Sequence, residues 1–316
     1  MNLQDFAPEG SRIQKSQTLL STPAGLQTAI EGQTILEGIA VSCDRAHNLA
    51  VDLGGLRGVI PRTECALGVA DGKTREIAIL SRVGKPVCFV VTGMEDGVLQ
   101  LSRRRAQEQA LGFLLSRQPG EVLPVCVTHL EPFGAFVDIG CGVPSFIGIE
   151  NISVSRISHP AERFACGQNI YAAVLYTDPS EGRVHLTHRE LLGTWAENAA
   201  CFQAGETVRG IVRSIESYGI FIELAPNLSG LAERRAGLCA GDAVSIYIKS
   251  ILPERMKIKL AVIDRLPPSP DGRPDPTPLR YFITEGRIQQ WVYSPPCCAG
   301  KYIATKFGEP DSPSCP

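Results

Sequence analysis

Two pairs of aromatic side chains, each built around a glycine, are the residues of this chain best suited to a specific chemistry. Phe133 and Phe136 occur in the segment Phe-Gly-Ala-Phe-Val, and Tyr218 and Phe221 occur in Tyr-Gly-Ile-Phe-Ile. Only 6% of the 316 residues are aromatic, so a repeated spacing draws attention to these four. Two exposed rings side by side form a platform on which flat groups such as unpaired nucleobases stack.

The alternation of side chains along a strand predicts which of these rings are exposed. In the segment 135–139, Ala135, Val137 and Ile139 share one face, which must be the core face because it is apolar. Phe136 then shares the solvent face with Asp138, and burial of apolar surface does not explain an aromatic ring at that position.

The second aromatic pair repeats this pattern, with Phe221 beside Glu223 on the predicted solvent face. Phe133 and Tyr218 precede their partners by three residues, which in a regular strand places them on the opposite face. The glycine that follows each of them permits a bulge that brings both rings onto one surface. Rings that pack under a loop or against a neighbouring module are the structural alternative, and the sequence leaves it open.

The elements that carry these rings belong to an internal repeat. Residues 120–138 align with residues 205–223 without gaps, and a looser third copy begins at Gly32. Five short strands with period-2 alternation in about 70 residues predict a closed oligonucleotide-binding (OB) barrel. In the middle copy the predicted strands are 122–130, 135–139, 146–149, 170–176 and 183–187. The first copy has His47 and Ala50 where the middle copy has Phe133 and Phe136, so it lacks the aromatic pair.

The predicted fold is all-β, with three tandem five-stranded OB-fold barrels joined by short helices and flanked by flexible termini. The predicted segments are a disordered N-terminus at 1–31, a degenerate domain at 32–103, a helical linker at 104–119, a domain at 120–187, a helical linker at 188–204, a domain at 205–264, and a Pro-rich linker with a C-terminal hairpin tail at 265–316. The turn of that hairpin is expected at Glu285–Gly286, and we expect the tail to dock on the rest of the chain.

Cysteine and histidine usage indicates no metal site and no cofactor. The eleven cysteines include no Cys-x-x-Cys pair, and the eight before residue 240 lie mostly in apolar segments, which predicts buried thiols. Three more, Cys297, Cys298 and Cys315, have no histidine nearby. Of the four histidines in the middle copy, His185 and His188 are expected to diverge from the end of one strand. The sequence also shows no clustered carboxylate motif for catalysis.

The charge balance argues against one mode of nucleic-acid binding. The chain has 31 Lys+Arg and 33 Asp+Glu, and residues 120–192 carry a net charge of −4, against +1 for residues 205–264. A protein that binds nucleic acid mainly through phosphates usually has a basic domain. We therefore expect stacking to supply much of any affinity. No segment reaches the roughly 18 apolar residues of a membrane helix, and no targeting signal is visible, so a cytoplasmic protein without a membrane partner is expected.

The glycine-initiated first strand, the Phe-Gly-x-Phe core and the ending Gly-Arg-Val-His-Leu-Thr (182–187) resemble the S1 RNA-binding domain, the repeat of the bacterial ribosomal protein S1 family. The resemblance covers about residues 32–264, and the whole chain is similar to the short S1-type proteins of Gram-positive bacteria. It implies an RNA face that comprises Phe133, Phe136, Asp178 and Arg183 in the middle domain, and Tyr218, Phe221 and Lys257 in the last. The family's strand-three histidine falls on Gly148 and Glu233. His185, Arg156 and Lys259 are further candidates for contact with RNA.

The resemblance also implies a function. It predicts a non-catalytic protein that binds single-stranded RNA, including mRNA, through tandem domains and contacts the small ribosomal subunit in translation. An accessory RNA-binding factor in RNA processing or decay is one alternative. A scaffold whose exposed rings bind another protein is a second alternative, and the salt dependence of binding separates these classes.

Overall fold

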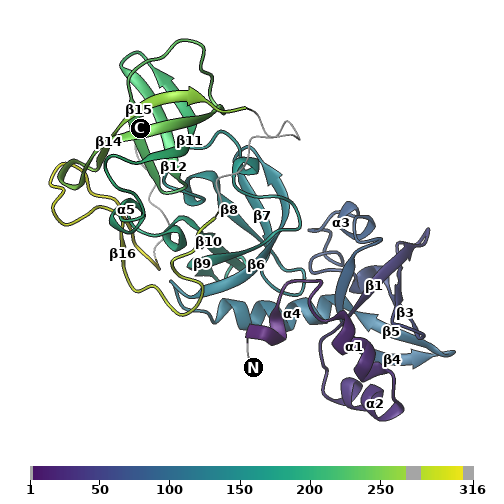
Figure 1. Cartoon of the computed structure of the whole chain (residues 1–316). Helices are drawn as coiled ribbons and strands as arrows, with labels where there is room; N and C mark the ends of the chain where they lie inside the picture. The colour runs from purple at the N-terminus through teal and green to yellow at the C-terminus, as the bar shows by residue number, and fades with distance from the viewer. Residues whose placement is uncertain (1–2, 268–278, 309–316) are drawn as a thin grey trace.

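The computed structural model describes residues 3–267 and 279–308, and these residues form three closed five-stranded barrels in succession along the chain (Figure 1). This confirms the predicted all-β fold with tandem OB-like barrels. In each barrel the first three strands form an antiparallel meander. The third strand then pairs in parallel with the fifth, and the fourth returns to the first and closes the barrel.

The strands of the middle barrel agree with the predicted ones to within two residues at each end. Barrel one consists of β1 (Leu36–Cys43), β2 (Leu49–Asp52), β3 (Arg57–Ile60), β4 (Pro86–Glu95) and β5 (Val98–Ser102), with the short helices η2 (Arg62–Glu64) and α3 (Ile77–Leu80). Barrel two consists of β6 (Val122–Glu131), β7 (Gly134–Asp138), β8 (Pro144–Gly148), β9 (Asn169–Asp178) and β10 (Arg183–Thr187), with η3 (Ile149–Asn151) and η4 (Pro160–Glu162). Barrel three consists of β11 (Thr207–Glu216), β12 (Gly219–Ala225), β13 (Leu228–Ala232), β14 (Ala243–Leu252) and β15 (Lys257–Arg265), with η6 (Pro253–Arg255).

A bulge in the first strand of every barrel allows the sheet to close. The register of β1, β6 and β11 with the next strand shifts by one residue, at Val41, Thr128 and Arg213 respectively. An extra residue bends the strand and increases its twist. Each long first strand can therefore pair with the second strand over one half and with the fourth strand over the other. The inward trio Ala135, Val137 and Ile139 is buried in the core of barrel two, as predicted.

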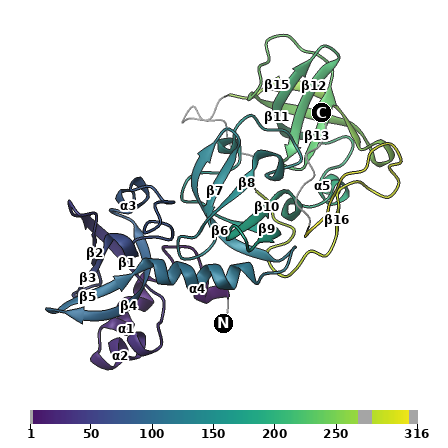
Figure 2. The same cartoon turned by 180° about the vertical axis from the view of Figure 1, so that it is seen from behind.

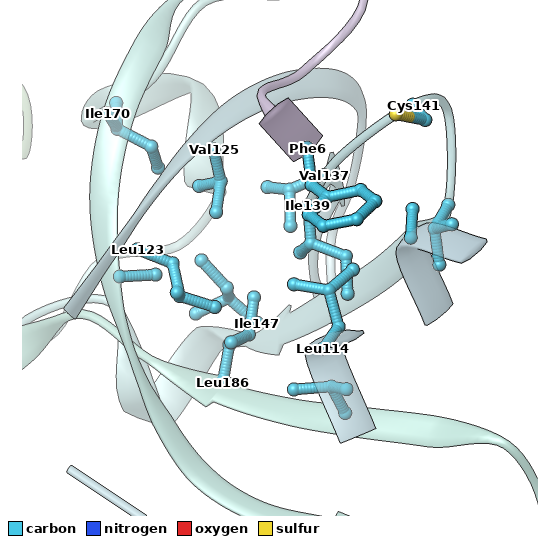
Figure 3. Packing of buried hydrophobic residues seen from close by; sticks show 14 of the residues in the cluster. Phe6, Leu114, Leu123, Val125, Val137, Ile139, Cys141, Ile147, Ile170 and Leu186 are labelled. Carbon is cyan, nitrogen blue, oxygen red and sulfur yellow. The ribbon is translucent and has the colours of Figure 1, made fainter. Parts of the chain in front are cut away.

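The N-terminal segment differs from the predicted disorder. Residues 3–31 form η1 (Leu3–Phe6), α1 (Ile13–Leu20) and α2 (Pro23–Glu31). Phe6 is buried in the core cluster of barrel two, next to Val137 and Ile139 (Figure 3). Its ring stacks on Phe113 at a centroid distance of 4.6 Å. Burying such a side chain contributes about 1.5–3 kcal/mol. These helices are too short to be stable alone, so the contacts with the barrels account for their formation.

Buried charges also fix the N-terminal segment between barrels one and two. Glu9 accepts hydrogen bonds from the Arg103 guanidinium at 2.8 and 3.0 Å and from the backbone N–H of Cys88 at 3.0 Å. Its own N–H donates to Asp138 of barrel two at 2.8 Å. Arg103 is the first residue of α4 (Arg103–Leu115), the helix that leads from barrel one to barrel two. Both views show barrel one at the N-terminal end of α4 and barrel two along its C-terminal part (Figures 1 and 2).

Barrels two and three are joined through the loop that follows β8. The hydroxyl groups of Ser155 and Ser229 share a hydrogen bond at 2.8 Å. The backbone N–H of Ser155 donates to the Pro226 carbonyl at 3.1 Å. The Asn227 side chain receives a hydrogen bond from the Val154 N–H at 2.9 Å. The short helices η5 (Arg189–Leu192) and α5 (Trp195–Ala199) complete the connection between the two barrels. Trp195 is buried in the core cluster of barrel three, where it fixes the orientation of α5.

The C-terminal tail docks on barrels two and three, but it does not form the predicted hairpin around Glu285–Gly286. In its described residues, 279–308, the strands are the pair β16 (Trp291–Val292) and β17 (Ala304–Thr305). The Gly286 carbonyl instead accepts a hydrogen bond from Val122 of barrel two, so that segment is used for docking. Residues 268–278, most of the predicted Pro-rich linker, lie outside the described residues, as does Cys315.

Three cysteines contradict the prediction of buried thiols. Cys166, Cys201 and Cys239 are exposed, because the turns in which they lie follow the ends of strands and helices rather than entering the cores. Cys65, Cys88 and Cys141 are buried. No helix in the described part of the chain combines the length and apolar character needed to span a membrane.

Candidate nucleic-acid interface

The aromatic pair of barrel two lies on the outer surface at the β6–β7 hairpin. Phe133 lies in the two-residue turn and is 58% exposed. Phe136 lies on β7, and the two rings are nearly perpendicular at a centroid distance of 6.3 Å. The two rings therefore share a surface, as predicted, but no bulge is present in β7. The two rings lie on the same surface because Phe133 is in the turn before β7, where the alternation of side chains along the strand does not apply.

The glycine between these rings has a different role from the predicted one. A Cβ at Gly134 would lie 2.3 Å from the Cζ atom of Phe146 and 2.4 Å from the carbonyl oxygen of Ile147. Real side chains do not approach so closely, so only glycine lets β8 and its aromatic ring lie against the start of β7.

Phe146 is a third ring of the surface, and it is not among the RNA-contacting residues predicted from the sequence. Its centroid lies 5.7 Å from that of Phe133 and 5.1 Å from that of Phe136. The signal was available in the sequence. Phe146 precedes the apolar Ile147 on a predicted strand, and Ile147 is fully buried, so strand alternation turns Phe146 outward.

These rings belong to a row of aromatic and imidazole side chains that crosses all five strands of barrel two. Cross-strand pairing places Phe136 opposite His129 and Phe146, and it places His185 opposite Phe146 and Tyr176. The His185 ring stacks on Tyr176 at 4.1 Å with an interplanar angle of 14°. We call His129, Phe136, Phe146, His185 and Tyr176 the aromatic row. With Phe133 beside it, the row forms a continuous surface for stacking.

Burial and the nearby Arg183 lower the pKa of His185 below its ordinary value. Its imidazole is therefore neutral at pH 7 and contributes a flat ring rather than a positive charge. The second histidine of this segment, His188, diverges as predicted. It is buried, with Nδ1 at 2.7 Å from the Ile152 carbonyl oxygen and Nε2 at 3.0 Å from the Tyr281 hydroxyl.

Barrel three has the same five positions with a different chemistry. Cross-strand pairing connects Ser214, Phe221, Leu231, Lys259 and Ser250. Tyr218 is 68% exposed at the β11–β12 turn, and its ring meets Phe221 edge to face at 6.2 Å. The row of barrel three thus provides one ring and a lysine, with Tyr218 beside it, whereas the row of barrel two provides only aromatic rings and imidazoles.

Barrel one provides no ring at these positions. The corresponding residues are Ser42, Ala50, Val59, Gln100 and Gly93. One scaffold therefore carries three different outer surfaces, and only those of barrels two and three offer aromatic stacking.

The structure contradicts the prediction that Asp138 and Glu223 face solvent beside the rings. Burial and the nearby Glu9 carboxylate raise the pKa of Asp138 to about 6, where it accepts hydrogen bonds from Gly140 and Gly142. Glu223 is fully buried and accepts hydrogen bonds from Arg163 and Arg213 at the junction of barrels two and three. In both cases a neighbouring element covers the outer face of the strand, the N-terminal segment at Asp138 and the loop of barrel two at Glu223, so strand alternation alone does not determine their exposure.

The charged candidate residues lie at the margins of the rows or within them. Arg183 and Lys257 are exposed at the starts of β10 and β15, and Lys259 lies within the row of barrel three. Asp178 is opposite Arg183, but its carboxylate accepts hydrogen bonds from Ser180 and Glu181 in the β9–β10 turn, and these bonds lower its pKa. Asp178 therefore stabilises the turn.

Two positions that the family assigns to a histidine are structurally different here. A Cβ at Gly148 would lie 2.2 Å from the Glu150 carboxylate, so the Glu150 side chain would have to move for this position to carry a side chain. Glu233 is exposed and pairs with Lys249 at 2.9 Å, which lowers the Glu233 pKa. Within residues 3–267 and 279–308, no three His, Cys, Asp or Glu side chains are grouped as a metal site requires.

Comparisons with known proteins agree with this geometry. The family model described as S1 RNA binding domain matches residues 117–189, which include barrel two. Small ribosomal subunit protein bS1 of Leuconostoc lactis is 28% identical over 244 residues, which cover 71% of this chain and 56% of the relative. The protein of the same name from Staphylococcus aureus (strain COL) is 25% identical over 281 residues, or 82% of this chain and 68% of that relative.

The chain thus spans little more than half of the Leuconostoc relative and about two thirds of the Staphylococcus one. A crystal structure of a multidomain protein with nucleic acid binding domains from Streptococcus pneumoniae is 13% identical, covers 75% of each chain and has a TM-score of 0.25. The family match and the two relatives show that residues 117–189 resemble the S1 RNA binding domain and that the chain is similar to bacterial ribosomal protein S1 in its short Gram-positive form.

Proposed function

We propose that this protein binds single-stranded RNA, including mRNA, without catalysing a reaction on it, and that it acts in translation in association with the small ribosomal subunit in the cytoplasm. The aromatic row of barrel two carries the proposal, because five stacked or neighbouring rings on an open outer surface fit a run of unpaired bases. The similarity to small ribosomal subunit protein bS1 supports the ribosomal part.

Stacking also accounts for RNA binding by a barrel whose net charge is negative. Each base stacked on an aromatic side chain contributes about 1–3 kcal/mol without a requirement for sequence. The exposed cations Arg183, Lys257 and Lys259 supply phosphate contacts next to the rings. Because barrels two and three are joined in one chain, binding to the first raises the effective concentration of the second along the same strand.

Replacement of the four rings tests the proposal. We expect the variant with Phe133, Phe136, Tyr218 and Phe221 all changed to Ala to bind a fluorescein-labelled dodecamer of uridine at least 100-fold more weakly at 0.1 M NaCl. Tyr247→Ala is the matched control, because Tyr247 is an exposed ring on β14 that lies outside the rows. Fluorescence anisotropy gives the affinities, and circular dichroism checks the fold. Equal binding by the folded four-site variant would refute the proposal.

The salt dependence distinguishes RNA binding from a protein-interaction scaffold. Contacts with phosphates release counterions, so the logarithm of an RNA affinity falls linearly with the logarithm of the salt concentration. Docking of the rings on an apolar protein surface has no comparable dependence. A ligand of this protein whose affinity is unchanged between 50 and 200 mM salt would favour the scaffold.

A further inference from the structure

A pocket of about 500 Å³ lies beside the aromatic pair of barrel three, and three distant segments of the chain form it. Tyr218 and Phe221 line one side from barrel three, and Arg156 lines another from the loop of barrel two. Tyr293 and Lys301 line it from the C-terminal tail. Its volume is within the range of pockets that hold small ligands.

Several hydrogen bonds fix the three segments around this pocket. The loop that carries Arg156 is attached to barrel three through the Ser155–Ser229 hydrogen bond at 2.8 Å. The tail is attached through Tyr293, whose hydroxyl donates to the Asn227 carbonyl at 2.6 Å. The pocket is therefore part of the folded junction between the barrels and the tail.

The charges in the pocket favour an anionic ligand. Arg156 and Lys301 are exposed, and neither forms an ion pair with another described residue. Arg213 also lines the pocket, but Glu223 and Glu162 neutralise it. Glu216 is the carboxylate that lines the pocket, and it offsets one of the two available cations. The combination of two rings with a net positive charge matches a nucleobase joined to phosphate.

We propose that this pocket binds one nucleotide of the RNA strand, with its base against Tyr218 and Phe221 and its flanking phosphates on Arg156 and Lys301. The inference rests on the proposed function and extends it. The RNA site of barrel three is then composite, because one phosphate ligand comes from barrel two and the other from the tail. An isolated third barrel would lack both cations.

The expected effect follows from counterion release. Each phosphate contact with a single strand contributes a salt slope of about 0.7, which corresponds to roughly fivefold in affinity at 0.1 M salt. The double variant Arg156→Ala/Lys301→Ala should therefore bind the uridine dodecamer about 25-fold more weakly. Its slope of log affinity against log salt should fall by about 1.4.

The matched control is Arg45→Ala/Lys306→Ala, which removes an exposed arginine from barrel one and an exposed tail lysine that does not line the pocket. The affinity of this control for the dodecamer should stay within twofold of that of the unmodified chain. Its slope of log affinity against log salt should stay within about 0.3. As a second measurement, the dodecamer should quench part of the tryptophan fluorescence, because Trp195, one of the two tryptophans of the chain, also lines the pocket. The quenching should decrease in the double variant.

The outcomes separate the two proposals. If the Arg156/Lys301 variant matches its control in affinity, slope and quenching while the unmodified chain binds RNA, the composite site is refuted and the proposed function stands. If the unmodified chain and the four-site aromatic variant bind equally well, the proposed function itself fails. A 25-fold loss confined to the Arg156/Lys301 variant supports the composite site.

Discussion

Replacement of Glu223 by Gln is expected to destabilise the junction between barrels two and three. The Glu223 side chain has no exposed surface, and it pairs with Arg163, which also has none, and with Arg213 at 2.8 and 3.0 Å. Gln preserves the size of the side chain and removes its charge. The Arg163 guanidinium then keeps the Ser153 hydroxyl at 3.3 Å and the Glu162 carbonyl at 3.4 Å as described partners.

The magnitude follows from this burial. Loss of one partner from a buried ion pair costs about 3–5 kcal/mol, since the remaining charge is left uncompensated. Arg213 retains its ion pair with Glu162, so we expect a value near the lower end, about 3 kcal/mol. If the free energy of unfolding decreases by about 2 kcal/mol per molar urea, the urea concentration at the unfolding midpoint should fall by roughly 1.5 M.

Urea unfolding followed by the fluorescence of Trp195 and Trp291, which are both buried in the core of barrel three, measures this midpoint. Glu233→Gln is the matched control, because Glu233 is 88% exposed in its pair with Lys249, and an exposed pair contributes about 0–1 kcal/mol.

A double variant tests the physical reason for the loss. Arg163→Met/Glu223→Leu removes both buried charges, and it should recover most of the lost stability because no unpaired charge remains. The reasoning is refuted if Glu223→Gln unfolds at the same urea concentration as the exposed control. It is also refuted if the double variant is as unstable as the single one.

Two further predictions follow from the site. Phe146→Ala removes the centre of the aromatic row and should weaken binding of the uridine dodecamer about 5- to 150-fold in anisotropy, from the loss of about 1–3 kcal/mol of stacking. Val59→Ala, the equivalent change in barrel one, should alter it less than twofold, and equal losses would contradict the role of the row. Burial lowers the pKa of His188 to about 4, against about 6.5 in the unfolded chain. Because only the unfolded state takes up the proton between these values, stability should fall as the pH falls, by about 2 kcal/mol between pH 7.5 and pH 5. Since Asp138 has the opposite dependence, urea unfolding of the chain should be compared with that of His188→Gln; the same pH dependence in both would exclude this role for His188.

Local pattern was sufficient to locate the aromatic pairs. The residue that precedes β7 and the outward residue on β7 are both aromatic, and the buried trio on the opposite face fixes the orientation of the strand. Phe146 required only the same alternation on the next strand. The pairing of His185 with Phe146 was not predictable, since it depends on the parallel contact between β10 and β8, which are distant in the sequence.

The helices of the N-terminal segment and the docked conformation of the C-terminal tail were not predicted, for a related reason. Residues 13–20 and 23–31 lack the long apolar periodicity of an independent helix, and they are ordered by burial of Leu20 and Ala29 in the core of barrel one. The segment before them is held by burial of Phe6 and by the pairing of Glu9 with Arg103. The tail contributes Ile288, Trp291 and Tyr293 to the core of barrel three instead of pairing with itself. In both cases the stabilising partner is far away in the sequence.

The amino-acid sequence alone determined the repeat, the three barrels and the inward or outward direction of most strand residues, because these depend on spacing within one strand or turn. Only the tertiary structure decided that Asp138 and Glu223 are buried, and that Arg156, Tyr218 and Lys301 meet at one pocket. Such contacts arise where one barrel, the next barrel and the tail pack together. Burial and electrostatics at these junctions depend on which surfaces meet, and no local pattern of residues specifies that.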